Sequence, residues 1–239
     1  MKTPFFRPGG NGLLWDNDLR PEGLAIRYAS NRLFANGGLH FLESDTLRSN
    51  SRIAYGFQTG YNGKIEVGQL IAGVSYFKLG PEGRAAWFDN NFFGNTIACV
   101  DASCVYNNDF EELELFAELK TTITKYPLTL FVDYVQNQDA SDHDTAWALG
   151  LKLGKASLPR TWEFGYTYQA VEADSLLGLW SDSDFGGGDT DTKGHIFKGA
   201  WAPNKNSKFG FTYFVNERGL HLGEGEDYNR LQIDCAFKF

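Results

Sequence analysis

The densest group of chemically active side chains is an acidic, glycine-rich stretch, DSDFGGGDTD, at residues 182–191. Hard cations bind clustered oxygen ligands, so a calcium site is one interpretation of its four carboxylates, Asp182, Asp184, Asp189 and Asp191. The stretch lacks the ligand spacing and the closing glutamate of an EF-hand. A solvated acidic loop, in which the glycines permit a tight path, is the favoured interpretation, and no metal site is predicted.

Histidine and cysteine spacing gives no catalytic motif. No obvious nucleophile lies beside any of the four histidines, His40, His143, His195 and His221. His143 stands between two aspartates in SDHD, where a solvated turn is favoured over a catalytic pair. We therefore predict no enzyme and no catalytic residue.

The cysteines favour an oxidising compartment. Cys99 and Cys104 lie close together in IACVDASCVY and could close a small loop through a disulfide. Cys235 falls on an apolar face, where it can act as a small hydrophobic residue.

Most of the remaining charges are carried by β-strands. Apolar and polar residues alternate in GLAIRY, ELELFAELK and TWEFGYTYQ, a period typical of strands with one apolar and one wet face. Roughly eleven strands of about ten residues, the length of tilted membrane-spanning strands, are expected, at 23–28, 33–42, 52–61, 65–77, 112–120, 127–137, 145–154, 161–169, 193–202, 208–217 and 228–239.

Composition supports an all-β protein. The 239 residues include 20 Phe, 11 Tyr, 6 Trp and 27 Gly, but only 7 Pro. No run approaches the ~18 apolar residues that a transmembrane helix requires. The net charge of −8 argues against a nucleic-acid partner. High glycine and aromatic content with modest hydrophobicity suits an antiparallel transmembrane β-barrel, and a large soluble β-sandwich or barrel is the alternative.

The connections between the expected strands alternate in length. Turn-sized ones fall at 61–64, 124–127, 154–159 and 202–207, and longer or more acidic ones at 43–50, 78–111, 138–143, 172–192 and 217–227. Short turns at one end and long loops at the other are typical of an outer-membrane barrel with periplasmic turns. The longest loop, 78–111, could equally fold into the lumen or cap it from outside. No repeat or linker divides the chain, so residues 1–239 are expected to form one domain.

The last strand has a distinctive ending. Apolar side chains alternate through YNRLQIDCAFKF and include Leu231, Ile233, Phe237 and the terminal Phe239. The pattern resembles the assembly signal of bacterial outer-membrane proteins, and the terminal aromatic would lie at the membrane interface.

Four stretches together resemble one family, the Gram-negative outer-membrane barrels known as putative porins. They are PFFRPGGNGLLWDNDLRPEGLAIRY (4–28), SDSDFGGGDTDTKGH (181–195), KFGFTYFVNE (208–217) and YNRLQIDCAFKF (228–239). The resemblance implies a passive, water-filled channel in the outer membrane that has no cofactor. Its partners would be membrane lipid and small hydrophilic solutes. Many porins are trimers, so a homo-trimer is one option.

The chain departs from that family in length. Relatives begin with a signal peptide and several further strands, and MKTPFF looks like the end of an upstream strand. Antiparallel bacterial barrels contain an even number of strands, whereas about eleven are expected here. We therefore expect an incomplete barrel of 11–12 strands, the C-terminal portion of a longer porin.

The resemblance implies that the wet faces of the strands line a pore. Both signs of charge occur on these faces, so the sequence does not predict a preference for cations or anions. A structural or anchoring barrel with a filled lumen, and a soluble ligand-binding barrel, are the alternatives. The pore-lining candidates are Arg27, Arg52, Glu66, Glu114, Glu118, Lys120, Asp133, Lys152, Glu163, Lys198, Arg230 and Asp234.

Overall fold

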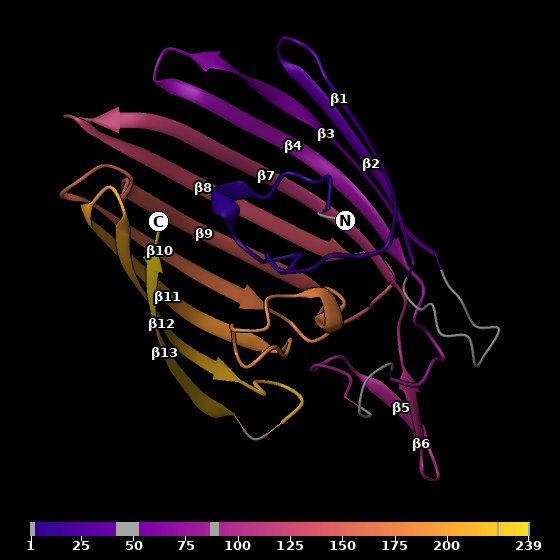
Figure 1. The fold of residues 1–239 in the computed structure, drawn as a ribbon. Helices are drawn as coiled ribbons and strands as arrows, with labels where there is room; N and C mark the ends of the chain where they lie inside the picture. Colours follow the sequence, from indigo (N-terminus) through magenta and orange to yellow (C-terminus); the bar gives the residue numbers. More distant parts are fainter. Residues whose placement is uncertain (1–2, 42–52, 87–90, 224, 239) are drawn as a thin grey trace.

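Eleven antiparallel strands form one curved sheet in the computed structural model, which describes residues 3–41, 53–86, 91–223 and 225–238 (Figure 1). The strands follow one another in chain order, so the sheet is a meander. They are β1 (Gly23–Ala29), β2 (Leu33–Phe41), β3 (Ile53–Ile65), β4 (Gly68–Leu79), β7 (Phe110–Ile123), β8 (Tyr126–Asn137), β9 (Thr145–Gly154), β10 (Thr161–Val171), β11 (Thr192–Asn204), β12 (Ser207–Arg218) and β13 (Glu226–Phe237). The predicted all-β meander and its eleven strands are confirmed.

Two smaller features complete the secondary structure. A separate hairpin pairs β5 (Ile97–Val100) with β6 (Ser103–Tyr106), and a disulfide joins Cys99 to Cys104 across it. Two single-turn 3₁₀ helices occur, η1 (Pro8–Gly10) and η2 (Gly178–Trp180). In the part of the chain that the structure describes, no helix is long and apolar enough to cross a membrane.

One predicted turn is wrong. The Asn-Gly pair at 61–64 suggested a turn, but β3 continues through it to Ile65 and pairs with β4 up to Gly68. Register with the neighbouring strand therefore overrides the local turn signal. As a consequence Glu66 lies in the β3–β4 turn rather than on a strand face.

The two ends of the sheet differ, as the loop lengths predict. One end, here called the turn end, carries the short connections 66–67, 124–125, 155–160 and 205–206. The other, the loop end, carries the connections 80–109, 138–144, 172–191 and 219–225. The hairpin β5–β6 extends beyond the sheet at the loop end (Figure 1).

The outer face of the sheet is apolar and uncovered by any described residue. Exposed side chains include Ile26, Phe57, Leu115, Val132 and Ile233, which come from five different strands. A face of this size would aggregate in water, because soluble monomers rarely expose apolar patches beyond a few hundred Å².

Aromatic side chains form two bands on this outer face. At the turn end, rings of Tyr126 and Trp162 lie 5.2 Å apart, Trp201 and Phe209 lie 6.4 Å apart, and Phe209 and Phe237 lie 6.2 Å apart. At the loop end, the band consists of Tyr55, Tyr76, Tyr134, Trp147 and Tyr168.

The bands are separated by six residues on β10, between Trp162 and Tyr168. Six residues of strand span roughly 20 Å, close to the height of the apolar zone between the aromatic girdles of outer-membrane barrels.

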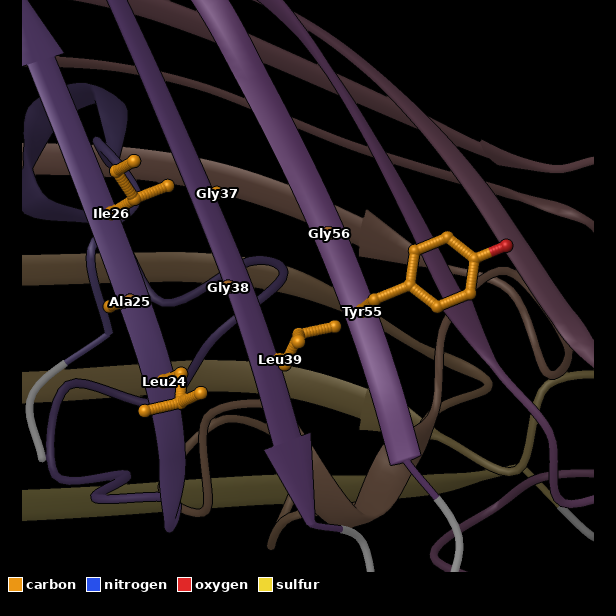
Figure 2. A pocket seen from close by; sticks show the side chains of 8 residues that line it. All are labelled: Leu24, Ala25, Ile26, Gly37, Gly38, Leu39, Tyr55 and Gly56. Carbon is orange, nitrogen blue, oxygen red and sulfur yellow. The ribbon is translucent and has the colours of Figure 1, made fainter.

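A shallow groove of about 530 Å³ opens on the outer face near β1 (Figure 2). The side chains of Leu24, Ile26, Leu39 and Tyr55 surround it, and its floor consists of backbone at Gly37, Gly38 and Gly56. The groove is apolar, faces away from the concave side and contains no charged residue.

The sheet does not close on itself. β1 pairs with β2 alone and β13 with β12 alone, so each has one unpaired edge among the described strands. The structure therefore contains an open sheet and not a closed barrel, where the sequence predicts an incomplete barrel of 11–12 strands.

Candidate functional site

The inner, concave face of the sheet gathers the polar side chains of the strands. It holds the predicted pore-lining residues except two: Glu66 is in a turn, and Arg52 lies outside the described residues. The inner set is Arg27, Glu114, Glu118, Lys120, Asp133, Lys152, Glu163, Lys198, Arg230 and Asp234.

The N-terminal segment, residues 3–22, crosses this inner face (Figure 1). Inward polar side chains bind its backbone: Gln58 accepts a hydrogen bond from the Phe6 N–H at 2.7 Å, and Glu118 accepts one from the Gly9 N–H at 2.6 Å. The Asn11 amide donates to Gln169 at 3.0 Å. Because buried backbone groups need partners, these side chains fix the path of the segment across β3, β7 and β10.

A second segment, the connection 172–191, also folds against the inner face (Figure 1). Leu176, Leu177 and Trp180 are buried in it. The Leu177 N–H donates to Glu112 of β7 at 3.1 Å. We call this connection and residues 3–22 the two inward segments.

An aromatic cluster joins the two inward segments to the sheet. The Trp15 ring lies 4.9 Å from Trp180, 5.1 Å from Phe77 and 5.6 Å from Phe5. His40 of β2 packs edge-on against Trp15 at 5.9 Å. This hydrophobic core lies inside the concavity and fills it toward the loop end.

Carboxylates on β7 and β8 are buried beneath this cover. Glu114, Asp133 and Glu118 are 2%, 2% and 3% exposed. Ser75 donates a hydrogen bond to Glu114, and Glu118 is held by Gly9 and by the Lys120 ammonium at 2.7 Å. These predicted pore-lining acids therefore have little contact with solvent.

The four aspartates of the acidic stretch do not converge on one point. Asp184 pairs with Arg230 at 2.9 Å, and Asp191 binds the His221 ring nitrogen Nδ1 at 2.7 Å. Burial raises the pKa of both Asp182 and Asp189. Among the residues that the structure describes, no three His, Cys, Asp or Glu side chains form a group that could hold a metal.

The histidines serve structural contacts. His143 and His221 stack with ring centroids 4.5 Å apart, which joins two loops at the loop end. His195 faces outward, and its ring nitrogen Nδ1 forms a hydrogen bond with the Tyr166 hydroxyl at 2.9 Å. None of these contacts pairs a histidine with a serine, threonine or cysteine nucleophile.

The long loop, predicted either to enter the lumen or to cap it, supports an inward segment from the loop end. Asn95 donates hydrogen bonds to the carbonyls of Ala173 and Leu176, at 2.7 and 2.9 Å, and accepts one from Gly178 N–H. The loop's Trp87 and Asp89 lie outside the described residues.

The inward position of the two segments was not predicted. A signal was present: GLLWDN at 12–17 contains two leucines and a tryptophan, and SLLGLW at 175–180 contains three leucines and a tryptophan. Large apolar residues in a connection are expected to be buried against other apolar residues. Here the two stretches pack against each other through Trp15 and Trp180.

Comparison with known proteins bears on what this face does. The model of the family described as "Putative porin" matches residues 84–239, which is more than half of the chain. Neither the curated proteins nor the solved structures contain a match. Porins are in general not enzymes. The chain belongs to the "Putative porin" family.

Proposed function

We propose that the protein forms a channel in the outer membrane through which small hydrophilic solutes and ions diffuse. The observation that carries the proposal is the contrast between the two faces of the sheet. The outer face is apolar between two aromatic bands, and the inner face carries charged and amide side chains. Membrane lipid would cover the first, and water would fill the space along the second.

Strand direction supports a larger barrel than the described sheet. In an antiparallel meander of eleven strands, the first and last strands run in the same direction. Their edges could meet only as a parallel pair, whereas bacterial single-chain barrels are antiparallel and even-numbered. We therefore propose that further strands lie between β1 and β13 in the closed barrel.

A structural barrel without a pore is the second candidate, since the hydrophobic core occupies part of the concavity. The turn half of the inner face favours the channel, because its side chains, such as Lys152 and Lys198, are exposed. A soluble ligand-binding barrel would turn its aromatics inward, but Trp162, Phe164 and Phe211 point outward and are exposed.

Planar bilayer recording tests the proposal. The protein extracted from outer membranes is expected to insert from detergent and produce stepwise ion currents. It should also migrate faster in electrophoresis when unheated, because a closed barrel resists SDS. Folded, heat-modifiable protein that never conducts would support the structural barrel instead, and protein soluble without detergent would exclude both.

A further inference from the structure

Strand register places four lysines in one row across the inner face. They are Lys64 on β3, Lys120 on β7, Lys152 on β9 and Lys198 on β11. Between them the register inserts one neutral residue on each intervening strand, namely Gln69, Thr129 and Gly165, and the row continues to Thr212. We call this set the lysine row. It carries no carboxylate.

The row lies directly below the cover formed by the inward segments. Glu118 stands two residues from Lys120 on β7 and binds Gly9 of the N-terminal segment at 2.6 Å. Toward the loop end, the inner acids are buried under that segment. Toward the turn end, the side chains of Lys120 and Lys152 are each 47% exposed. The fold thus buries Glu114, Glu118 and Asp133 and leaves the lysines of the row exposed.

The opposing charges near the row are few. Glu118 pairs with Lys120, and Glu163 pairs with Lys152 at 3.4 Å with 20% of its side chain exposed. Asp234 and Glu163 both lie in the same hollow as Lys198 and Lys208, and Asp182 of the connection 172–191 interacts electrostatically with Lys198. Fixed positive charge therefore exceeds negative charge in the exposed part of the inner face.

The spacing of the row allows its charges to act together. Lysines on alternate strands have backbones roughly 10 Å apart, twice the distance between neighbouring strands. That spacing is about one Debye length at 0.1 M salt, so the potentials of neighbouring ammonium groups overlap. A band of overlapping positive potential concentrates anions and repels cations.

We propose that the lysine row makes the channel selective for small anionic solutes. The inference rests on the proposed channel function and adds the class of solute to it. Anions would enter the turn half of the lumen at raised local concentration and pass the row by exchange between ammonium groups. Counted without regard to burial, the charges of the inner face are mixed and indicate no preference. The preference for anions follows only when the buried carboxylates are left out of the count.

The reversal potential of the channel across a KCl gradient tests the proposal. Wild-type protein from outer membranes is expected to pass chloride in preference to potassium. The double substitution K64Q/K198Q should lower the chloride-to-potassium permeability ratio by about two-fold or more at 0.1 M salt. K64R/K198R should preserve the ratio. These two lysines are chosen because neither takes part in an ion pair between the described side chains.

The control is K205Q, which removes an exposed lysine from the β11–β12 turn and should change the ratio less. Unchanged heat-modifiable migration would show that each variant still folds. A conducting wild-type channel without chloride preference would overturn the inference and leave the channel standing. A chloride-to-potassium permeability ratio that K64Q/K198Q does not alter would also overturn the inference. Absence of any conductance would overturn both.

Discussion

Asp191, the last residue of the connection 172–191, binds the connection that follows β12. Its side chain accepts hydrogen bonds from the backbone N–H groups of His221 and Leu222, at 2.8 and 2.9 Å, and binds the His221 ring. Burial alone would raise the pKa of Asp191, but these hydrogen bonds outweigh it and the pKa is lowered. The carboxylate thus stabilises the connection 219–225 in its ionised form.

The sign of the pH dependence follows from that lowered pKa. A carboxyl group whose folded-state pKa lies below its unfolded value, ~3.9 for Asp, contributes its full stabilisation above that value. The stabilisation is lost as the pH falls through the folded-state pKa.

We expect Asp191→Asn to release residues 219–222 at neutral pH, at a local cost of about 1–3 kcal/mol, because a charged acceptor is lost. Hydrogen exchange at the His221 and Leu222 amides measures the effect. Asp189→Asn serves as the control, because Asp189 lies nearby and makes no described hydrogen bond to either amide. Exchange at the His221 and Leu222 amides that is as slow in D191N as in the wild type would contradict the assignment.

At the scale of elements, the backbone of the N-terminal segment comes close to the sheet at Gly9. Gly9 and Gly10 both have a positive φ, +63° and +65°. A Cβ at Gly9 would lie 2.3 Å from the Phe131 ring, whereas a Cβ at Gly10 would meet nothing within 4 Å. Substitutions at these two glycines therefore distinguish the effect of backbone strain from the effect of contact with the sheet.

Gly9→Ala is expected to lift residues 3–22 from the inner face, and Gly10→Ala is the matched control. Both substitutions place a side chain at positive φ and cost roughly 1–2 kcal/mol for that reason. Only the first also forces Phe131 aside, so hydrogen exchange over residues 3–22 should increase far more in G9A. Equal exchange in the two variants would show that the contact with Phe131 does not hold the segment.

The whole molecule is an open sheet whose closure is the central structural question. β1 and β13 are its edges, and outward side chains of both are largely exposed, Ile26 at 72% and Ile233 at 73%. Exposed strand edges promote aggregation, so a membrane barrel that leaves none is the stable arrangement.

Cysteine cross-linking distinguishes the two ways to close the barrel, and Cys235 of β13 supplies one partner. We expect I26C to form no disulfide with Cys235 in membrane-embedded protein, because the proposed closed barrel has further strands between β1 and β13. F209C is the positive control, since Phe209 faces Cys235 in the β12–β13 register. An I26C–Cys235 disulfide within a monomer would show that β1 and β13 are neighbours in a narrower barrel.

The sequence by itself determined the strands and their two faces. Alternation with a period of two is a local property, and it predicted all eleven strands of the sheet and placed Leu115 outward and Glu114 inward. The alternation of short and long connections was also predicted, because turn residues act within a few positions, although the turn predicted at 61–64 lies instead at 66–67. Ten of the twelve predicted pore-lining residues lie on the inner face, whereas Glu66 lies in a turn and Arg52 lies outside the described residues.

Tertiary structure alone decided which of those charges meet solvent. Burial of Glu114 and Asp133 depends on segments that are distant in the sequence, and no local pattern encodes that contact. The lysine row likewise exists only through register, because Lys64 and Lys198 are aligned by strand pairing across the seven strands from β3 to β11. Local periodicity thus determined the faces of the sheet, and long-range packing determined what the inner face offers to a solute.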